Sequence, residues 1–125
     1  MSESFDPGAL MARHYLLPGG FRVCLRLPRI GDREGVRRLC GRHDLELDEL
    51  ELARLVGFDP RRRLVICATG LIGSAETVLG VGAIEIAADA DPWLLVIDDR
   101  AEGLGSLLAD ALLGRAQALR RARAA

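Results

Sequence analysis

The sequence predicts an α+β domain in which a mostly antiparallel sheet is flanked by helices. Continuous apolar runs of strand length occupy residues 64–68 and 93–97, while other segments repeat apolar residues at helical spacing. Half of the 125 residues are hydrophobic and the formal net charge is −1, which is typical of a folded domain with a buried core. The segments follow the order strand, two helices, three strands, helix, so a sheet of about four strands is expected.

Residues 1–20 are expected to form an N-terminal arm, and residues 21–125 the domain. Turn signals at Pro7-Gly8 and Pro18-Gly19-Gly20 flank residues 9–16. This stretch is predicted to be a short helix.

The first strand and the two helices of the domain follow this arm. Residues 21–27 alternate apolar and polar side chains at most positions, as half-buried strands do. Asp32 is a candidate N-cap for the first helix, which Gly41 is expected to end. Asp44 is a candidate N-cap for the second helix, with Gly57 as its stop signal.

The second helix carries an acidic cluster. Binding of a cation or of a basic substrate is one interpretation. A solvated helix face is favoured, because consecutive positions point in different directions around a helix. The cluster consists of Glu46, Asp48, Glu49 and Glu51.

Two further strands, residues 64–68 and 78–86, are predicted to pair as a hairpin around residues 70–76. Gly80 and Gly82 lie inside the second of these strands. No third glycine opens a helix after them, so a dinucleotide-binding fingerprint is not indicated. We expect these glycines to mark a β-bulge or a close approach of another element.

Several functional classes are excluded by composition. The chain has no basic excess and few aromatic residues, which argues against nucleic-acid binding. No apolar stretch is long enough to span a membrane and the start lacks the pattern of a secretory signal, so we expect a cytoplasmic protein. The cysteines have no metal-ligand spacing, so no metal site is predicted and each is expected to be a small buried residue; they are Cys24, Cys40 and Cys67.

Chemistry is indicated most clearly where the apolar strand at residues 93–97 turns through glycines into a helix. Glycine allows positive φ and close approach of a ligand to the main chain. The first N–H groups of a helix lack intrahelical acceptors and, together with the helix dipole, favour a phosphate or another anion. The loop therefore predicts a site for a phosphate-bearing ligand.

The spacing Arg100-x-x-Gly103-x-Gly105 resembles the Arg/Gln-x-x-Gly-x-Gly/Ala signature of the GNAT acetyltransferase superfamily. The order of the preceding strand, two helices and hairpin is similar to that family over roughly residues 21–120, and most similar to domains of bacterial protein acetyltransferases. The resemblance implies transfer of an acetyl group from acetyl-CoA to an amine, on a small molecule or a protein lysine. It also implies an acyl-CoA site in which the loop holds the pyrophosphate and the preceding strand pairs with the pantetheine arm; these residues are Leu95, Val96, Ile97, Arg100, Ala101, Glu102, Gly103, Leu104, Gly105 and Ser106.

Acetyltransferases of this kind commonly use a carboxylate on a central strand to remove a proton from the amine, directly or through water. Glu85 is the only carboxylate within an apolar strand and is the candidate for this role. An outward-facing residue at the solvent side of the strand is the alternative interpretation.

Two features depart from the family pattern. Ala101 and Glu102 replace the glycine and the basic or small residue that are usual in the loop. The sequence ends with the helix after the loop, whereas the family continues through further strands, so the expected domain is a GNAT-like fold without its C-terminal strands. The strand at residues 93–97 would then be an uncovered apolar edge, which favours a homodimer or a partner that completes the sheet. A catalytically inactive module for coenzyme A sensing or dimerisation is the alternative function.

Overall fold

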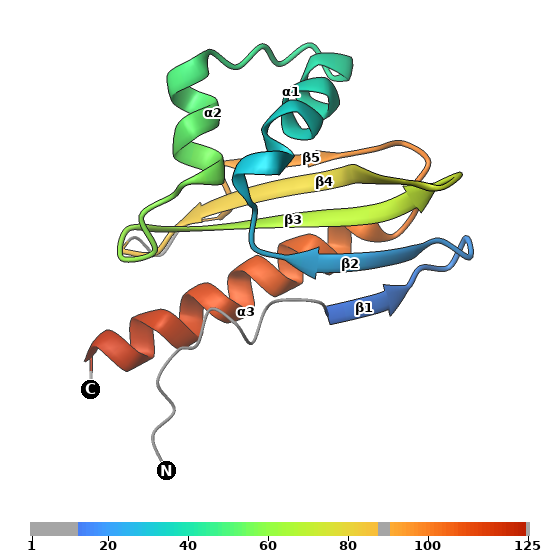
Figure 1. Ribbon diagram of the computed structural model, residues 1–125. Helices are drawn as coiled ribbons and strands as arrows, with labels where there is room; N and C mark the ends of the chain where they lie inside the picture. Colours follow the sequence, from blue (N-terminus) through green and yellow to red (C-terminus); the bar gives the residue numbers. More distant parts are fainter. Residues whose placement is uncertain (1–12, 88–90, 125) are drawn as a thin grey trace.

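A five-stranded antiparallel open sheet, with strands in sequence order, forms the centre of the molecule (Figure 1). The computed structural model describes residues 13–87 and 91–124. Within these residues the fold is α+β, as the sequence predicts. The strands are β1 (Arg13–Leu16), β2 (Arg22–Arg26), β3 (Arg63–Ile72), β4 (Ala75–Glu85) and β5 (Leu94–Ile97). The helices are a short 3-10 turn η2 (Ile30–Asp32), α1 (Arg33–Arg42), α2 (Glu49–Val56) and α3 (Leu104–Ala124).

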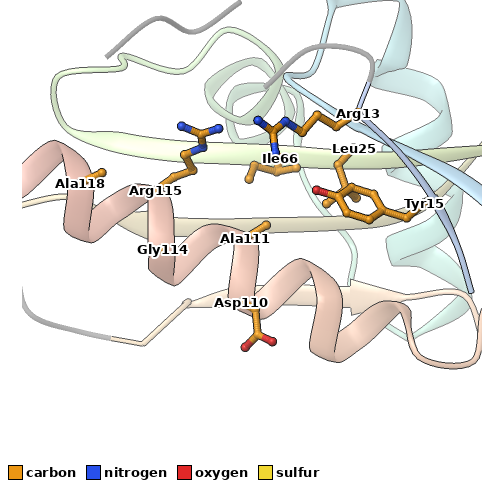
Figure 2. A pocket seen from close by; sticks show the side chains of 9 residues that line it. All are labelled: Arg13, Tyr15, Leu25, Ile66, Asp110, Ala111, Gly114, Arg115 and Ala118. Carbon is orange, nitrogen blue, oxygen red and sulfur yellow. The ribbon is translucent and has the colours of Figure 1, made fainter. Parts of the chain in front are cut away.

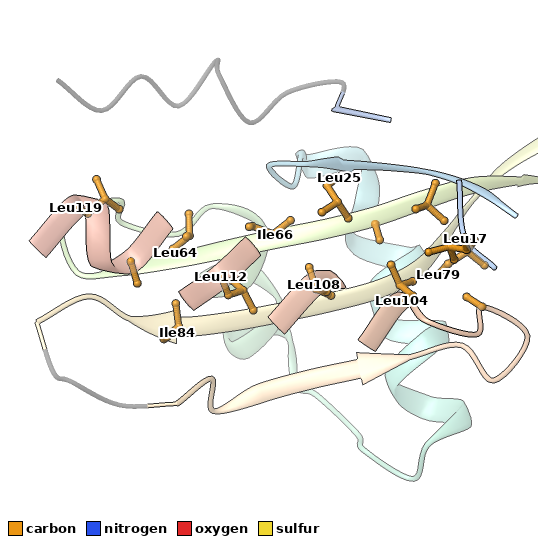
Figure 3. Close-up of a cluster of buried hydrophobic side chains, with 14 of the residues drawn as sticks. Leu17, Leu25, Leu64, Ile66, Leu79, Ile84, Leu104, Leu108, Leu112 and Leu119 are labelled. Atoms are coloured by element: carbon orange, nitrogen blue, oxygen red, sulfur yellow. The ribbon is translucent and has the colours of Figure 1, made fainter. Parts of the chain in front are cut away.

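Helices cover both faces of the sheet: α1 and α2 lie on one face and α3 crosses the other (Figure 1). Because successive strand residues point to opposite faces, β3 contributes alternately to two apolar cores. Leu64 and Ile66 pack with the leucines of α3 (Figure 3), whereas Val65 and Cys67 pack with α1 and α2. The continuous apolar run of β3 is thus explained by burial on both sides.

The glycines of β4 mark both a bulge and a close approach, as expected. Ala68 pairs with Gly80 and Thr69 pairs with Val78, so Leu79 is the extra residue of a β-bulge. A Cβ atom at Gly82 would lie 2.5 Å from Cδ1 of Leu112 on α3. The absence of a side chain at this position lets α3 lie close against the sheet.

The helix predicted for residues 9–16 is wrong over the part that the structure describes, because residues 13–16 form β1. His14 pairs with Cys24 and Tyr15 with Val23 in an antiparallel ladder. The Pro18-Gly19-Gly20 signal is the turn of this hairpin, with Gly20 at a φ of +88°. The ladder with β2 outweighs the weak helical preference of so short a segment. Residues 9–12 lie outside the described residues. The sheet consequently has five strands where about four were expected.

The second helix begins later than predicted, and Asp48 is its N-cap in place of Asp44. The Asp48 carboxylate accepts a hydrogen bond from the Glu51 N–H, and the Glu51 carboxylate accepts one from the Asp48 N–H, at 2.8 and 3.1 Å. This reciprocal pair is a capping box. Asp44 instead adopts a φ of +59° in the connecting loop. Gly57 ends the helix as predicted.

Two observations complete the fold. Asp32 occupies the N-cap position of α1, but its side chain does not cap the helix. Its carboxylate accepts a hydrogen bond from Arg26 of β2 instead. Across residues 13–87 and 91–124, no helix combines the length and apolar character that crossing a membrane requires.

Candidate functional site

The loop between β5 and α3 forms two consecutive turns. Ala101 N–H donates to the Asp98 carbonyl at 2.9 Å, and Leu104 N–H donates to the Ala101 carbonyl at 3.1 Å. Gly103 has a φ of +89°, a left-handed conformation that favours glycine, and α3 begins at the next residue. The backbone conformation at Gly103 therefore favours the glycine that the signature has at this position.

An ion pair inside the loop fixes the signature arginine. Arg100 donates from Nε and Nη2 to the two carboxylate oxygens of Asp98, at 2.9 and 2.8 Å, and its N–H donates to Oδ1 at 2.9 Å. These hydrogen bonds from Arg100 lower the pKa of Asp98 to about 2, although burial acts in the opposite direction. Arg42 of α1 adds a contact at 3.4 Å. The sequence signature did not predict this ion pair, which involves Asp98 and Arg42. The signal for Asp98 was its position two residues before Arg100.

The first turn of α3 presents unused donors. Within the described chain, the N–H groups of Gly105 and Ser106 have no main-chain acceptor. Ser106 is exposed and Gly105 is partly exposed, so this turn lies at the surface. Ala101 is buried beneath the turn, while Glu102 is exposed. A negatively charged group at this end of the helix would meet free N–H groups and the positive end of the helix dipole.

The outer edge of β5 also presents main-chain groups. Asp98 N–H donates to the Leu79 carbonyl at 2.7 Å, and Val96 is paired with Val81. Hydrogen-bonded pairs alternate along an antiparallel ladder, so the N–H and C=O of Leu95 and Ile97 point away from β4. The N–H of Val96, one of the residues that the family resemblance assigns to the acyl-CoA site, is turned toward β4.

The β5 edge carries apolar side chains as well as free main-chain groups. The structure places β5 at one end of the strand order, with no further strand beside it in the described residues. Trp93 is 51% exposed and Leu95 is 41% exposed. Uncovered edges with apolar side chains normally pair with a ligand or another strand.

Glu85 does not join the loop and the β5 edge. It lies four residues along β4 from Val81, the partner of Val96, which corresponds to about 13 Å of strand. Its carboxylate is paired with Arg63, with Nε–Oε2 and Nη2–Oε1 distances of 3.3 and 3.4 Å. The guanidinium of Arg63 also lies 5.5 Å from the centre of the Trp93 ring. Glu85 is thus held in a cross-strand ion pair with Arg63, at the end of the hairpin that lies away from its turn.

A second polar cluster, at the junction of β2 and α1, was not expected from the sequence. Arg26 donates to both carboxylate oxygens of Asp32 at 2.7 Å, and to Glu76 at 3.2 Å. Burial acts to raise the pKa of Asp32, but the hydrogen bonds from Arg26 and from the Arg29 N–H outweigh it and lower the pKa. Asp32 and Glu76 border a cavity of about 370 Å³ that Thr69 also lines.

Two of the three cysteines are buried, as the sequence predicts, and the third is only partly buried. Cys40 and Cys67 are buried and Cys24 is partly buried, and none forms a disulfide. Burial raises the pKa of Cys67 to about 12, so its thiol stays protonated at neutral pH.

A scan against protein-family models found no match to this chain, and searches of curated proteins and of solved structures likewise found none.

Proposed function

We propose that this chain is a GNAT-like acyl-CoA-binding domain that transfers an acetyl group from acetyl-CoA to an amine. The observation that carries the proposal is the juxtaposition of two features at one end of the sheet. One is the outward-facing main chain of Leu95 and Ile97, and the other is the first turn of α3. A strand edge next to a helix N-terminus suits a ligand that has an amide-containing arm and a pyrophosphate.

The pyrophosphate would be bound by the N–H groups of Gly105 and Ser106. Arg100 is held by Asp98 but its side chain is 52% exposed, so its outer face remains open to a phosphate oxygen. Glu102 is exposed, and its repulsion of a phosphate 4 Å away is about 1 kcal/mol in water. Several charge-assisted hydrogen bonds outweigh a repulsion of that size.

The pantetheine arm would extend along β5 as an additional strand. Its amides would pair with the N–H and C=O groups of Leu95 and Ile97, as extended ligands pair with open sheet edges. The thioester carbonyl would then accept a hydrogen bond from one of these N–H groups. This polarisation favours attack by the amine nitrogen, with coenzyme A leaving as the thiol.

The proton of the attacking amine requires an acceptor. Glu85 or a water molecule is the proposed base. Glu85 lies about 13 Å along the strand from Val81 and is paired with Arg63. We therefore favour a water molecule as the base.

The alternative proposal is an inactive module that pairs with a second copy through β5. The exposure of Trp93 and Leu95 on the free edge favours this reading. Sedimentation velocity over a range of concentrations separates the two. A dimer that Leu95→Lys and Ile97→Lys convert to a monomer, in a chain that does not bind acetyl-CoA, supports the module.

Calorimetric titration with acetyl-CoA tests the proposed ligand. Ser106→Glu places a carboxylate in the first turn of α3, where it favours the helix dipole but repels a pyrophosphate. We expect this variant to fold normally and to bind acetyl-CoA at least about tenfold more weakly, a loss of about 1.4 kcal/mol. Ser106→Gln and Gln117→Glu are matched controls and should bind as the natural chain does. No binding by a folded natural chain overturns the proposal.

Turnover is tested separately. The chain is incubated with acetyl-CoA and a set of amines, including lysine peptides, and the released thiol is measured. Release that depends on an amine supports the enzyme. Binding without release supports a coenzyme A-sensing module.

A further inference from the structure

A groove at the β1 side of the sheet, away from the β5 edge, supports an inference that does not depend on the acyl-CoA proposal. It lies between β1, β2 and α3 and has a volume of about 270 Å³ (Figure 2). Its apolar lining includes Leu25, Ile66 and Ala111, and the ring of Tyr15 stands at one end. The groove is therefore apolar at its base.

Two arginines border this apolar base. Arg13 comes from β1 and Arg115 from α3; both line the groove, and in Figure 2 the Arg13 side chain extends toward the side where the Arg115 guanidinium lies. Among the described residues, neither side chain has a hydrogen bond or an ion pair. Arg37, Arg63 and Arg100 are by contrast all paired with carboxylates.

Among the described residues, the carboxylate that lines the groove does not neutralise the two arginines. Asp110 belongs to the lining, but its carboxylate points away from both guanidinium groups in Figure 2. Two like charges that line one groove repel each other, so an anion bound by both guanidinium groups gains from both. The arrangement resembles a forked receptor for an anion.

We propose that this groove binds a small phosphate monoester that carries an apolar group. Two guanidinium forks match the two negative charges and the several acceptor oxygens of such a phosphate. The apolar group would lie on Leu25, Ile66 and Ala111. A free metabolite and the headgroup of an anionic lipid share this chemistry.

The groove is separate from the proposed acyl-CoA site. The groove adjoins β1 and the acyl-CoA site adjoins β5, and these are the two edge strands of the sheet. The groove extends under β2 to Ile66 of β3, and two spacings between strands, about 10 Å, separate β3 from β5. Ligands of the two sites should therefore bind without competition.

Calorimetric titration with n-hexyl phosphate tests the proposal. We expect Arg13→Gln and Arg115→Gln each to weaken binding by about tenfold or more. Arg121→Gln is the matched control, because Arg121 is an exposed residue of the same helix outside the groove, and it should change binding less than about twofold. Inorganic phosphate and n-hexanol should each bind more weakly than n-hexyl phosphate. Equal binding by the natural chain and the two groove variants would overturn the proposal, as would an absence of binding.

A second variant blocks the groove without removing charge. Gly114 lies in α3 beside the groove, and a Cβ atom there would meet nothing within 4 Å. Gly114→Phe should fill the groove and abolish binding, while its melting temperature stays at or above that of the natural chain. Gly41→Phe on α1 is the matched control and should bind normally. Undiminished binding by Gly114→Phe contradicts the site.

Vesicles distinguish the two sources of the phosphate. Cosedimentation with phosphatidic acid vesicles that Arg115→Gln abolishes supports the groove and identifies a lipid headgroup. Binding of n-hexyl phosphate without cosedimentation supports the groove and identifies a free metabolite. Addition of coenzyme A should leave n-hexyl phosphate binding unchanged, so this test is independent of the proposed acetyltransferase function.

Discussion

Arg26 and Asp32 form a buried bidentate ion pair, with both N–O distances at 2.7 Å and side chains only 4% and 9% exposed. Because the pair joins the end of β2 to the start of α1, it fixes how the helical layer begins above the sheet. Removing Asp32 would leave the buried Arg26 charge with only the 3.2 Å contact to the exposed Glu76, which compensates it poorly.

Asp32→Ala is therefore expected to lower the free energy of unfolding by about 3–5 kcal/mol, with Arg26 left buried. The double variant Arg26→Met with Asp32→Leu should lose less than Asp32→Ala alone, because no buried charge remains. Urea denaturation followed by circular dichroism measures both. A single variant as stable as the natural chain would show that the pair does not hold β2 to α1.

The pKa of Asp98 predicts a specific acid sensitivity. Its pKa of about 2 lies below the ordinary value of 3.8, so the ionised form stabilises the fold above about pH 4. This contribution is lost as the pH falls from 4 toward 2. Since Arg100 is half-exposed, we expect it to be about 1–2 kcal/mol.

The measurement compares the natural chain with Asp98→Asn across this pH range. The natural chain should be the more stable at pH 5, and the difference should shrink as the pH falls from 4 to 2. A difference that is constant with pH would mean that Asp98 does not titrate in this window.

The glycines of β4 and α3 should respond to alanine in opposite directions. Gly82→Ala places a Cβ atom 2.5 Å from Leu112, and this overpacking should cost about 1–3 kcal/mol. Gly114→Ala meets no neighbour and should stabilise α3 by about 0.5–1 kcal/mol. Thermal unfolding gives both values. Similar changes at the two sites would argue against the close approach of α3 to the sheet.

The capping box predicts which residue starts the second helix. Asp48→Ala should cost about 1 kcal/mol, because the Glu51 N–H loses its acceptor. Asp44→Asn should be neutral, since asparagine tolerates the left-handed conformation at this position. A larger loss of stability for Asp44→Asn than for Asp48→Ala would instead indicate that the second helix starts at Asp44, as the sequence predicts.

Local sequence patterns predicted the elements that are long or strongly apolar. The strand ending at Ile97 and the helix beginning at Leu104 follow from an apolar run, a glycine loop and helical spacing. The hairpin of β3 and β4 was predicted for the same reason, although its strands extend farther toward the turn at Gly73.

Features that depend on tertiary pairing were not predictable from local patterns. β1 is only four residues long, and its conformation is set by the ladder with β2. The pairing of Arg26 with Asp32 depends on the chain bending between β2 and α1. The direction of the Leu95 and Ile97 amides depends on the register of β5 against β4, which no pattern within the strand reveals. Candidate site residues could thus be selected from the sequence, but their roles in the geometry could not.

The central claim is that the free edge of β5 and the first turn of α3 form one acyl-CoA site. The most direct measurement follows the main-chain amides by ¹H–¹⁵N NMR during a titration with acetyl-CoA. We expect the amides of Leu95, Ile97, Gly105 and Ser106 to shift together, and more strongly than the amide of Val96, which faces β4. Unchanged amides at β5 and α3, at acetyl-CoA concentrations in the millimolar range, would contradict it.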